Sequence, residues 1–142
     1  MKLIHLTLLM SLLLLLGCSL PTQYRSVSPH FEGELKFNNT PLKNTKILLS
    51  LNPKDTLCNQ ATITTKTDEL GKFSLKAAKK EYSYTPFLDY QLNEWIVCTE
   101  HKGQHITLYS NNRYTTENIT DSVVLDCDLS LRPLNAPCTV TH

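Results

Sequence analysis

The sequence has little surplus charge of either sign. Because Lys2 is the one charged residue among residues 1–17, the rest of the chain carries equal numbers of acidic and basic side chains. It contains no run of five or more like charges, and no basic stripe interleaves with aromatic residues. The sequence therefore contains no basic patch of the kind that binds nucleic acid, and we expect no nucleic-acid partner.

Patterns that support catalysis or metal binding are also missing. No Gly-x-Ser-x-Gly turn offers a nucleophilic serine, and no two cysteines have the Cys-x2-Cys or Cys-x4-Cys spacing of a zinc site. His101 and His105 lie beside Glu100, but they flank a predicted turn, and we interpret them as an exposed polar turn. Asp126 and Asp128 alternate on one predicted strand and are expected to face solvent. We therefore expect no enzyme, no cofactor and no metal.

The N-terminus has the form of a signal peptide. Lys2 precedes an almost unbroken apolar run over residues 3–16. This run has about the length of a signal h-region and falls short of the ~20 residues that a membrane-spanning helix needs. We expect no permanent transmembrane anchor.

The end of this apolar run resembles the lipobox of bacterial lipoproteins. Its sequence is Leu15-Leu16-Gly17-Cys18, and in that family the cysteine is acylated and becomes the new N-terminus. The resemblance implies a signal peptide over residues 1–17 and a lipid on Cys18. Ser19, in place of an aspartate that resembles the inner-membrane retention signal, implies the outer membrane. The alternative is an ordinary signal peptide in which Cys18 is only a small residue near the cut.

The remaining chain is expected to be a tether and one domain. Residues 18–30 are polar, contain two prolines and show no periodicity, which is typical of a tether. Residues 31–142 are enough for a single domain with its own core. We expect no second domain.

From residue 31 onward the apolar pattern has a period of two, as in half-buried strands. Strands are expected at residues 31–38, 45–51, 61–66, 72–77, 94–99, 104–109 and 122–129. Gly71 and Gly103 lie in the turns of two expected hairpins, and Gly103 occupies a position that favours positive φ. No segment of residues 18–142 has a convincing helical repeat. About seven short strands predict an all-β fold, an antiparallel β-sandwich.

The cysteines beyond Cys18 are even in number, which in an exported chain predicts two disulfides. Four cysteines allow three pairings, and sequence alone does not decide among them. We favour Cys58 with Cys98, because a loop cysteine after the second strand can reach a neighbouring strand. We pair Cys127 with Cys138, because residues 130–137 are long enough to fold back.

Two segments resemble the carboxypeptidase regulatory-like domain of the transthyretin-like (prealbumin-like) superfamily. Pro41-Leu42 and Asn44 match its first turn, and Thr67-Asp-Glu-Leu-Gly-Lys-Phe73 matches its Thr-Asp-x-x-Gly-x-Phe turn. The resemblance covers residues 31–77 and implies a transthyretin-like domain over residues 31–142. In the second turn we expect Asp68 to accept hydrogen bonds from backbone amides, Gly71 to adopt a conformation that a side chain resists, and Phe73 to enter the core.

The resemblance implies a non-catalytic module. One enzymatic branch of the superfamily, the 5-hydroxyisourate hydrolases, ends in Tyr-Arg-Gly-Ser, whereas this chain ends in Cys-Thr-Val-Thr-His. The second half of the chain also looks similar to small uncharacterised bacterial lipoproteins that carry such a domain.

Aromatic residues concentrate between positions 82 and 95, where Pro86 argues against a continuous strand. We favour a stretch that covers one open end of the sandwich and completes the core, with Trp95 and Phe87 buried. In the alternative, part of it is exposed and forms a contact surface. The candidate partner-binding residues are then Tyr82, Tyr84 and Tyr90, because a tyrosine can keep its hydroxyl in water while its ring packs.

Together these features predict a lipid-anchored binding or structural module at the outer membrane, facing the periplasm, with an unknown periplasmic protein as its partner. One version is an immunity or inhibitor lipoprotein, an expectation that depends on analogy alone. The alternatives are an accessory subunit of an envelope complex and, less favoured, a periplasmic hydrolase with an unrecognised site.

Overall fold

The computed structural model describes residues 23–52, 54–82, 91–115, 118–130 and 137–142. The signal peptide, Cys18, Tyr84, Phe87 and Tyr90 lie outside these residues, and of Tyr82 only the backbone is described. In the described ranges no helix is long and apolar enough to cross a membrane.

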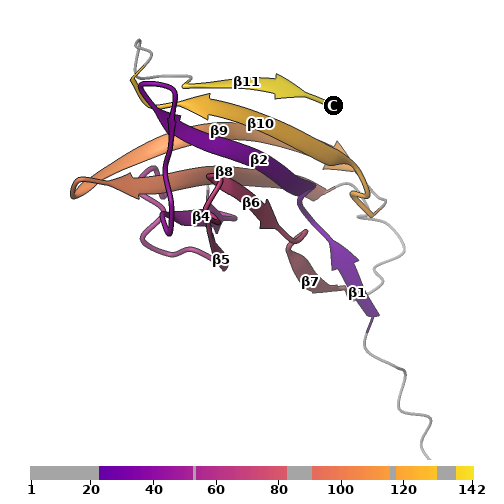
Figure 1. Ribbon diagram of the computed structural model, residues 1–142. Helices are drawn as coiled ribbons and strands as arrows, with labels where there is room; N and C mark the ends of the chain where they lie inside the picture. The colour runs from indigo at the N-terminus through magenta and orange to yellow at the C-terminus, as the bar shows by residue number, and fades with distance from the viewer. Residues whose placement is uncertain (1–22, 53, 83–90, 116–117, 131–136) are drawn as a thin grey trace, which may run out of the picture.

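The described chain consists of strands joined by turns and loops (Figure 1). The strands are β1 (Gln23–Ser26), β2 (His30–Phe37), β3 (Thr40–Pro41), β4 (Lys46–Ser50), β5 (Ile63–Lys66), β6 (Lys72–Leu75), β7 (Lys79–Tyr82), β8 (Gln91–His101), β9 (Gln104–Thr115), β10 (Ser122–Asp128) and β11 (Cys138–Thr141). They form two larger sheets and one small two-stranded sheet. The prediction of an all-β, sandwich-like fold with two disulfides is confirmed.

The first large sheet contains one parallel pair. Its order is β11, β10, β2, and both β6 and β3 pair along the remaining side of β2. β2 and β10 run parallel, with Phe31 opposite Val123 and Leu35 opposite Cys127. The sheet therefore differs from the wholly antiparallel one expected. Between β2 and β10 the chain builds the entire second sheet, and this long crossover permits parallel pairing.

The second large sheet is antiparallel, in the order β5, β4, β8, β9. Its longest pair, β8 and β9, turns at Lys102 and Gly103, whose φ angles are 52° and 73°. Two positive φ angles are typical of the type I′ turn that joins twisted strands. The hairpin predicted here is confirmed, and its strands extend to Gln91 and Thr115, beyond the expected bounds.

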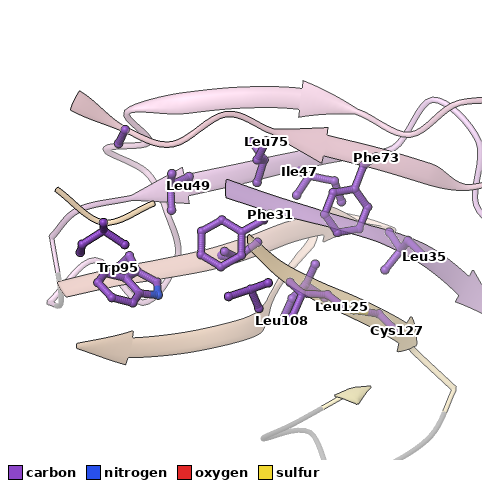
Figure 2. Close-up of a cluster of buried hydrophobic side chains, with 14 of the residues drawn as sticks. Phe31, Leu35, Ile47, Leu49, Phe73, Leu75, Trp95, Leu108, Leu125 and Cys127 are labelled. Atoms are coloured by element: carbon purple, nitrogen blue, oxygen red, sulfur yellow. The ribbon is translucent and has the colours of Figure 1, made fainter. Parts of the chain in front are cut away.

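The core lies between the facing sides of the two large sheets, and Figure 2 shows its main side chains. Alternate residues of strands such as β4, β6 and β10 point into it, as the period of two predicts. Trp95 is 2% exposed, in agreement with the interpretation that this residue completes the core. The other large, fully buried side chains of this core include Phe31, Leu35, Ile47, Leu49, Leu75, Ile119, Leu125 and Val97.

The hairpin expected on either side of Gly71 does not form. β5 pairs with β4 and β6 pairs with β2, so the turn between them carries the chain from one sheet to the other. The local roles are confirmed. The Asp68 carboxylate accepts hydrogen bonds from the backbone N–H groups of Leu70 and Lys72, both at 2.8 Å, and Gly71 has a φ of 75°. Phe73 is buried in the core.

The segment before β2 belongs to the fold. β1 pairs with β7, and Val27 and Ser28 are buried. The backbone N–H of Val27 donates to the carbonyl of Ala78 at 2.8 Å, and the Ala78 N–H donates to the Ser28 hydroxyl at 2.9 Å. The tether predicted over residues 18–30 is therefore wrong from residue 23 onward. This segment is attached to the rest of the fold by hydrogen bonds more than by an apolar face. For this reason its sequence shows no apolar period.

Both disulfides have the predicted pairing. Cys58 and Cys98 connect the loop after β4 to β8, with a Cα–Cα distance of 6.1 Å. Cys127 and Cys138 are opposed residues of β10 and β11, with a Cα–Cα distance of 4.0 Å. Each bridge fixes a segment that contributes few side chains to the main core.

Removing the first bridge is expected to destabilise the domain more than removing the second. The sequence separations are 40 and 11 residues, and a longer closed loop restricts the unfolded chain more strongly. The double variant Cys58→Ala/Cys98→Ala should lose about 3–4 kcal/mol of unfolding free energy, and Cys127→Ala/Cys138→Ala about 2–3 kcal/mol. Urea denaturation without reductant measures both. A larger loss for the second variant would contradict this account.

Candidate binding face

The outer face of the second large sheet is covered in part by the loop between β4 and β5. Cys58 and Cys98, with Ile96 and the partly buried Leu48, form a small apolar cluster separate from the main core. The disulfide holds the loop against β8 at this point. The cluster and the bridge together give this face a fixed surface.

Asp55 organises the same loop. Its carboxylate accepts hydrogen bonds from the backbone N–H groups of Asn59 at 2.8 Å and Gln60 at 2.7 Å, and from the Ser50 hydroxyl at 3.0 Å. Burial acts to raise the pKa of Asp55, but these hydrogen bonds outweigh it and lower the pKa below its ordinary value. Asp55 therefore stays ionised and holds the loop in one conformation.

Between this loop and the β8–β9 hairpin lies an open hollow of about 1020 Å³. Its apolar side chains include Leu57, which is 49% exposed, and Ile106. Glu94 and His105 are its ionisable members. Most of the other side chains carry a hydroxyl or an amide, namely Thr56, Gln104, Thr107, Ser110, Asn111 and Asn112. The hollow thus combines uncharged hydrogen-bonding groups with an exposed leucine, and we call it the β8–β9 hollow.

The sequence did not reveal this hollow. Its loop side comes from residues near Cys58 and its strand side from β8 and β9, and no periodicity connects the loop with the strands. A bulge between Val97 and Cys98 also shifts the register of β8 against β9. The signal that was available is the Cys58–Cys98 pairing, which places the loop beside the hairpin.

The two histidines of the hairpin occupy different surroundings. Glu100 lies opposite His105, and His101 opposite Gln104. His105 lines the β8–β9 hollow, whereas the His101 ring lies 5.3 Å from the Phe37 ring. Burial, assisted by the charge of Lys102, lowers the pKa of His101. Among the described residues, no group of three or more His, Cys, Asp or Glu side chains is arranged to hold a metal ion.

The alternating carboxylates of β10 hold neighbouring structure. Asp126 pairs with Lys36 at 3.3 Å. Asp128 accepts hydrogen bonds from the hydroxyl and backbone N–H of Ser130 at 2.6 and 2.9 Å, and from the N–H groups of Asn39 and Asn38 at 3.0 and 3.2 Å. These bonds lower the pKa of Asp128 to about 2. Asp128 therefore fixes the turn between β2 and β3 beside the end of β10.

The candidate partner-binding tyrosines belong to the aromatic stretch between positions 82 and 95. Tyr84 and Tyr90 lie outside the described residues, and so does the side chain of Tyr82. The backbone of Tyr82 pairs with Gln23, at the opposite end of the sandwich from the hairpin turn (Figure 1). The proposed role of these tyrosines in partner binding stays a prediction.

Most of the chain matches the model of a protein family. The model of a family described as a domain of unknown function (DUF6795) matches residues 31–132. The match begins within β2 and extends just past β10, so it includes the loop and both strands of the β8–β9 hollow. A comparison with curated proteins finds no match.

Proposed function

The chain belongs to the family of the domain of unknown function DUF6795, and we propose that it is a non-catalytic binding module, anchored by a lipid on Cys18 and facing the periplasm. Its partner is a protein of the cell envelope. We assign the contact to the β8–β9 hollow.

The composition of the hollow carries this proposal. Hydroxyl and amide groups cost less to desolvate than charged groups and can form hydrogen bonds with a protein partner, and Leu57 supplies an exposed apolar contact. The Cys58–Cys98 bridge and the hydrogen bonds to Asp55 hold the loop before a partner arrives. A surface that is already ordered loses less conformational entropy on binding.

Two further features support the proposed location and the non-catalytic role. Disulfides in a domain of this size are typical of oxidising compartments such as the periplasm, and here they attach the loop after β4 and the edge strand β11 to paired strands of the two sheets. Asp55, Asp68 and Asp128 each accept several hydrogen bonds from turns or loops. Carboxylates used in this way are structural and not placed for acid–base chemistry.

The substitution Leu57→Asp is expected to weaken partner capture about tenfold or more, because it places a charge in the apolar part of the contact. The tagged mature protein is used for capture from envelope extracts, and the captured protein is identified by mass spectrometry. Leu70→Asp is the matched control, because Leu70 is 60% exposed and lies outside the hollow.

Capture that is equal for Leu57→Asp, Leu70→Asp and the unsubstituted protein would show that the hollow is not the contact. The identity of the captured protein separates two versions of the proposal. A toxin or hydrolase identifies an immunity or inhibitor lipoprotein, whereas a structural envelope protein identifies an accessory subunit.

A further inference from the structure

The small sheet of β1 and β7 forms a ribbon at one end of the sandwich, opposite the turn of the β8–β9 hairpin (Figure 1). It is attached to the body of the fold through the bonds between residues 27–28 and Ala78. The Arg25 guanidinium also donates to the carbonyl of Thr115 at the end of β9, at 3.1 Å. The ribbon is therefore a fixed part of the domain, and its orientation is that of the whole sandwich.

The ribbon carries exposed lysines on both of its faces and an exposed aromatic side chain. Tyr24 lies opposite Glu81 on the face that also holds Lys79, whereas Lys80 lies on the other face. Lys79 and Lys80 are exposed on β7, Lys76 is exposed just before it, and Glu81 is the acidic residue of the strand. Tyr24 on β1 is 65% exposed, the largest exposure among the large hydrophobic residues of the described chain. Because residues 18–142 have no net charge, this local excess of lysine is compensated elsewhere in the domain.

The ribbon is also the part of the fold closest along the chain to Cys18. Five peptide units separate Cys18 from Gln23, and even fully extended they span at most about 18 Å. A lipid on Cys18 therefore keeps the start of β1 within about 18 Å of the headgroups. β2, which continues away from the ribbon, is eight residues long and spans about 26 Å.

We propose that the β1–β7 ribbon docks on the bilayer by its β7 edge, so that Lys79 and Lys80 on its two faces and the preceding Lys76 all reach anionic phospholipid headgroups and the Tyr24 ring lies at the interface. This inference depends on the lipidation of Cys18 proposed above. Lysines near an anionic surface are attracted to it, and tyrosine is enriched at the boundary between headgroups and acyl chains. Docking directs the hairpin turn at Lys102 away from the membrane.

Residues at the opposite end provide a matched comparison. Leu70 is 60% exposed, close to the value for Tyr24, and it lies in the turn whose Gly71 carbonyl accepts a hydrogen bond from the Leu35 N–H. Lys102 lies over the Phe37 ring, 4.6 Å from its centroid, and Lys43 pairs with Glu69 at 2.8 Å. At the end of β2 far from the ribbon, these residues therefore provide an exposed large side chain and two lysines that can be compared with Tyr24 and the lysines of the ribbon.

Tryptophan quenching in vesicles tests the proposal. The lipidated protein is incorporated into vesicles of phosphatidylethanolamine and phosphatidylglycerol whose acyl chains are brominated near the headgroups. The chain has one tryptophan, Trp95, which is 2% exposed and gives the background signal. Tyr24→Trp should lose most of its added fluorescence, whereas Leu70→Trp should keep it.

The lysines are tested in the Tyr24→Trp background. Lys79→Gln/Lys80→Gln should lower the ratio of docked to undocked protein about fivefold per lysine, and Lys43→Gln/Lys102→Gln should leave this ratio unchanged.

The outcomes separate this inference from the proposed function. Equal quenching of the Tyr24→Trp and Leu70→Trp variants in proteins that remain on the vesicles would overturn ribbon docking and leave the lipid anchor in place. A protein that carries no acyl group and does not associate with vesicles would instead refute the anchor. A urea-denaturation midpoint of each lysine variant equal to that of Tyr24→Trp confirms that the core is intact.

Discussion

The substitution Gly33→Val is expected to cost about 5 kcal/mol or more of unfolding free energy, within the exceptional range for a single substitution and comparable to the whole stability of many small domains. Gly33 lies in the middle of β2, between Phe73 on β6 and Leu125 on β10. A Cβ atom at this position would overlap the Leu125 carbonyl oxygen and lie 2.8 Å from Cζ of Phe73. Since backbone cannot give way as a flexible side chain does, β2 and β10 would have to separate.

Gly103→Ala is the control for this prediction. A Cβ at Gly103 meets no atom within 4 Å, and its cost comes from the φ of 73° alone. That cost is about 1 kcal/mol. Urea denaturation followed by Trp95 fluorescence compares the variants. A Gly33→Val protein that unfolds at the midpoint of the unsubstituted protein would refute the close packing of β2, β6 and β10.

The faces of the strands could be predicted from the sequence, because a period of two directly reports which side chains are buried. Phe31 and Leu35 on β2, and Val123, Leu125 and Cys127 on β10, all lie in the core as the pattern indicates. The favoured disulfide pairing came from a different argument, that the loop cysteine Cys58 can reach a neighbouring strand and that residues 130–137 are long enough to fold back, and the structure has this pairing.

Strand partners could not be predicted in the same way. The turn around Asp68 has identical local hydrogen bonds whether it joins paired strands or strands of different sheets, so its motif does not select β2 as the partner of β6. The parallel pairing of β2 with β10 depends on the long crossover between them. The apolar pattern within either strand does not indicate this distant partner.

The segment at residues 23–30 and the β8–β9 hollow escaped prediction for a related reason. Both are assembled by contacts between distant residues, such as the bond from Arg25 to the Thr115 carbonyl. Both segments are rich in polar residues, as a tether or a loop is. The burial of Ser28 depends on the fold and is not indicated by this composition. Sequence composition reports the average environment of such residues and not their partners.

The lipid anchor is the feature on which both the proposed function and ribbon docking depend. The substitution Cys18→Ala removes the thiol that would be acylated, and it leaves the fold from Gln23 onward unchanged. Because acyl chains contribute ~0.8 kcal/mol for each buried methylene group, a diacylated protein is held firmly by the membrane and an unacylated one is not. The variant should therefore remain an unprocessed precursor or become soluble.

Metabolic labelling with a radioactive fatty acid measures this directly, with Ser19→Ala as a control that leaves the cysteine in place. The account predicts a labelled band for the unsubstituted protein and for Ser19→Ala, and none for Cys18→Ala. Equal labelling of the Cys18→Ala variant, or no labelling of the unsubstituted protein, would contradict it.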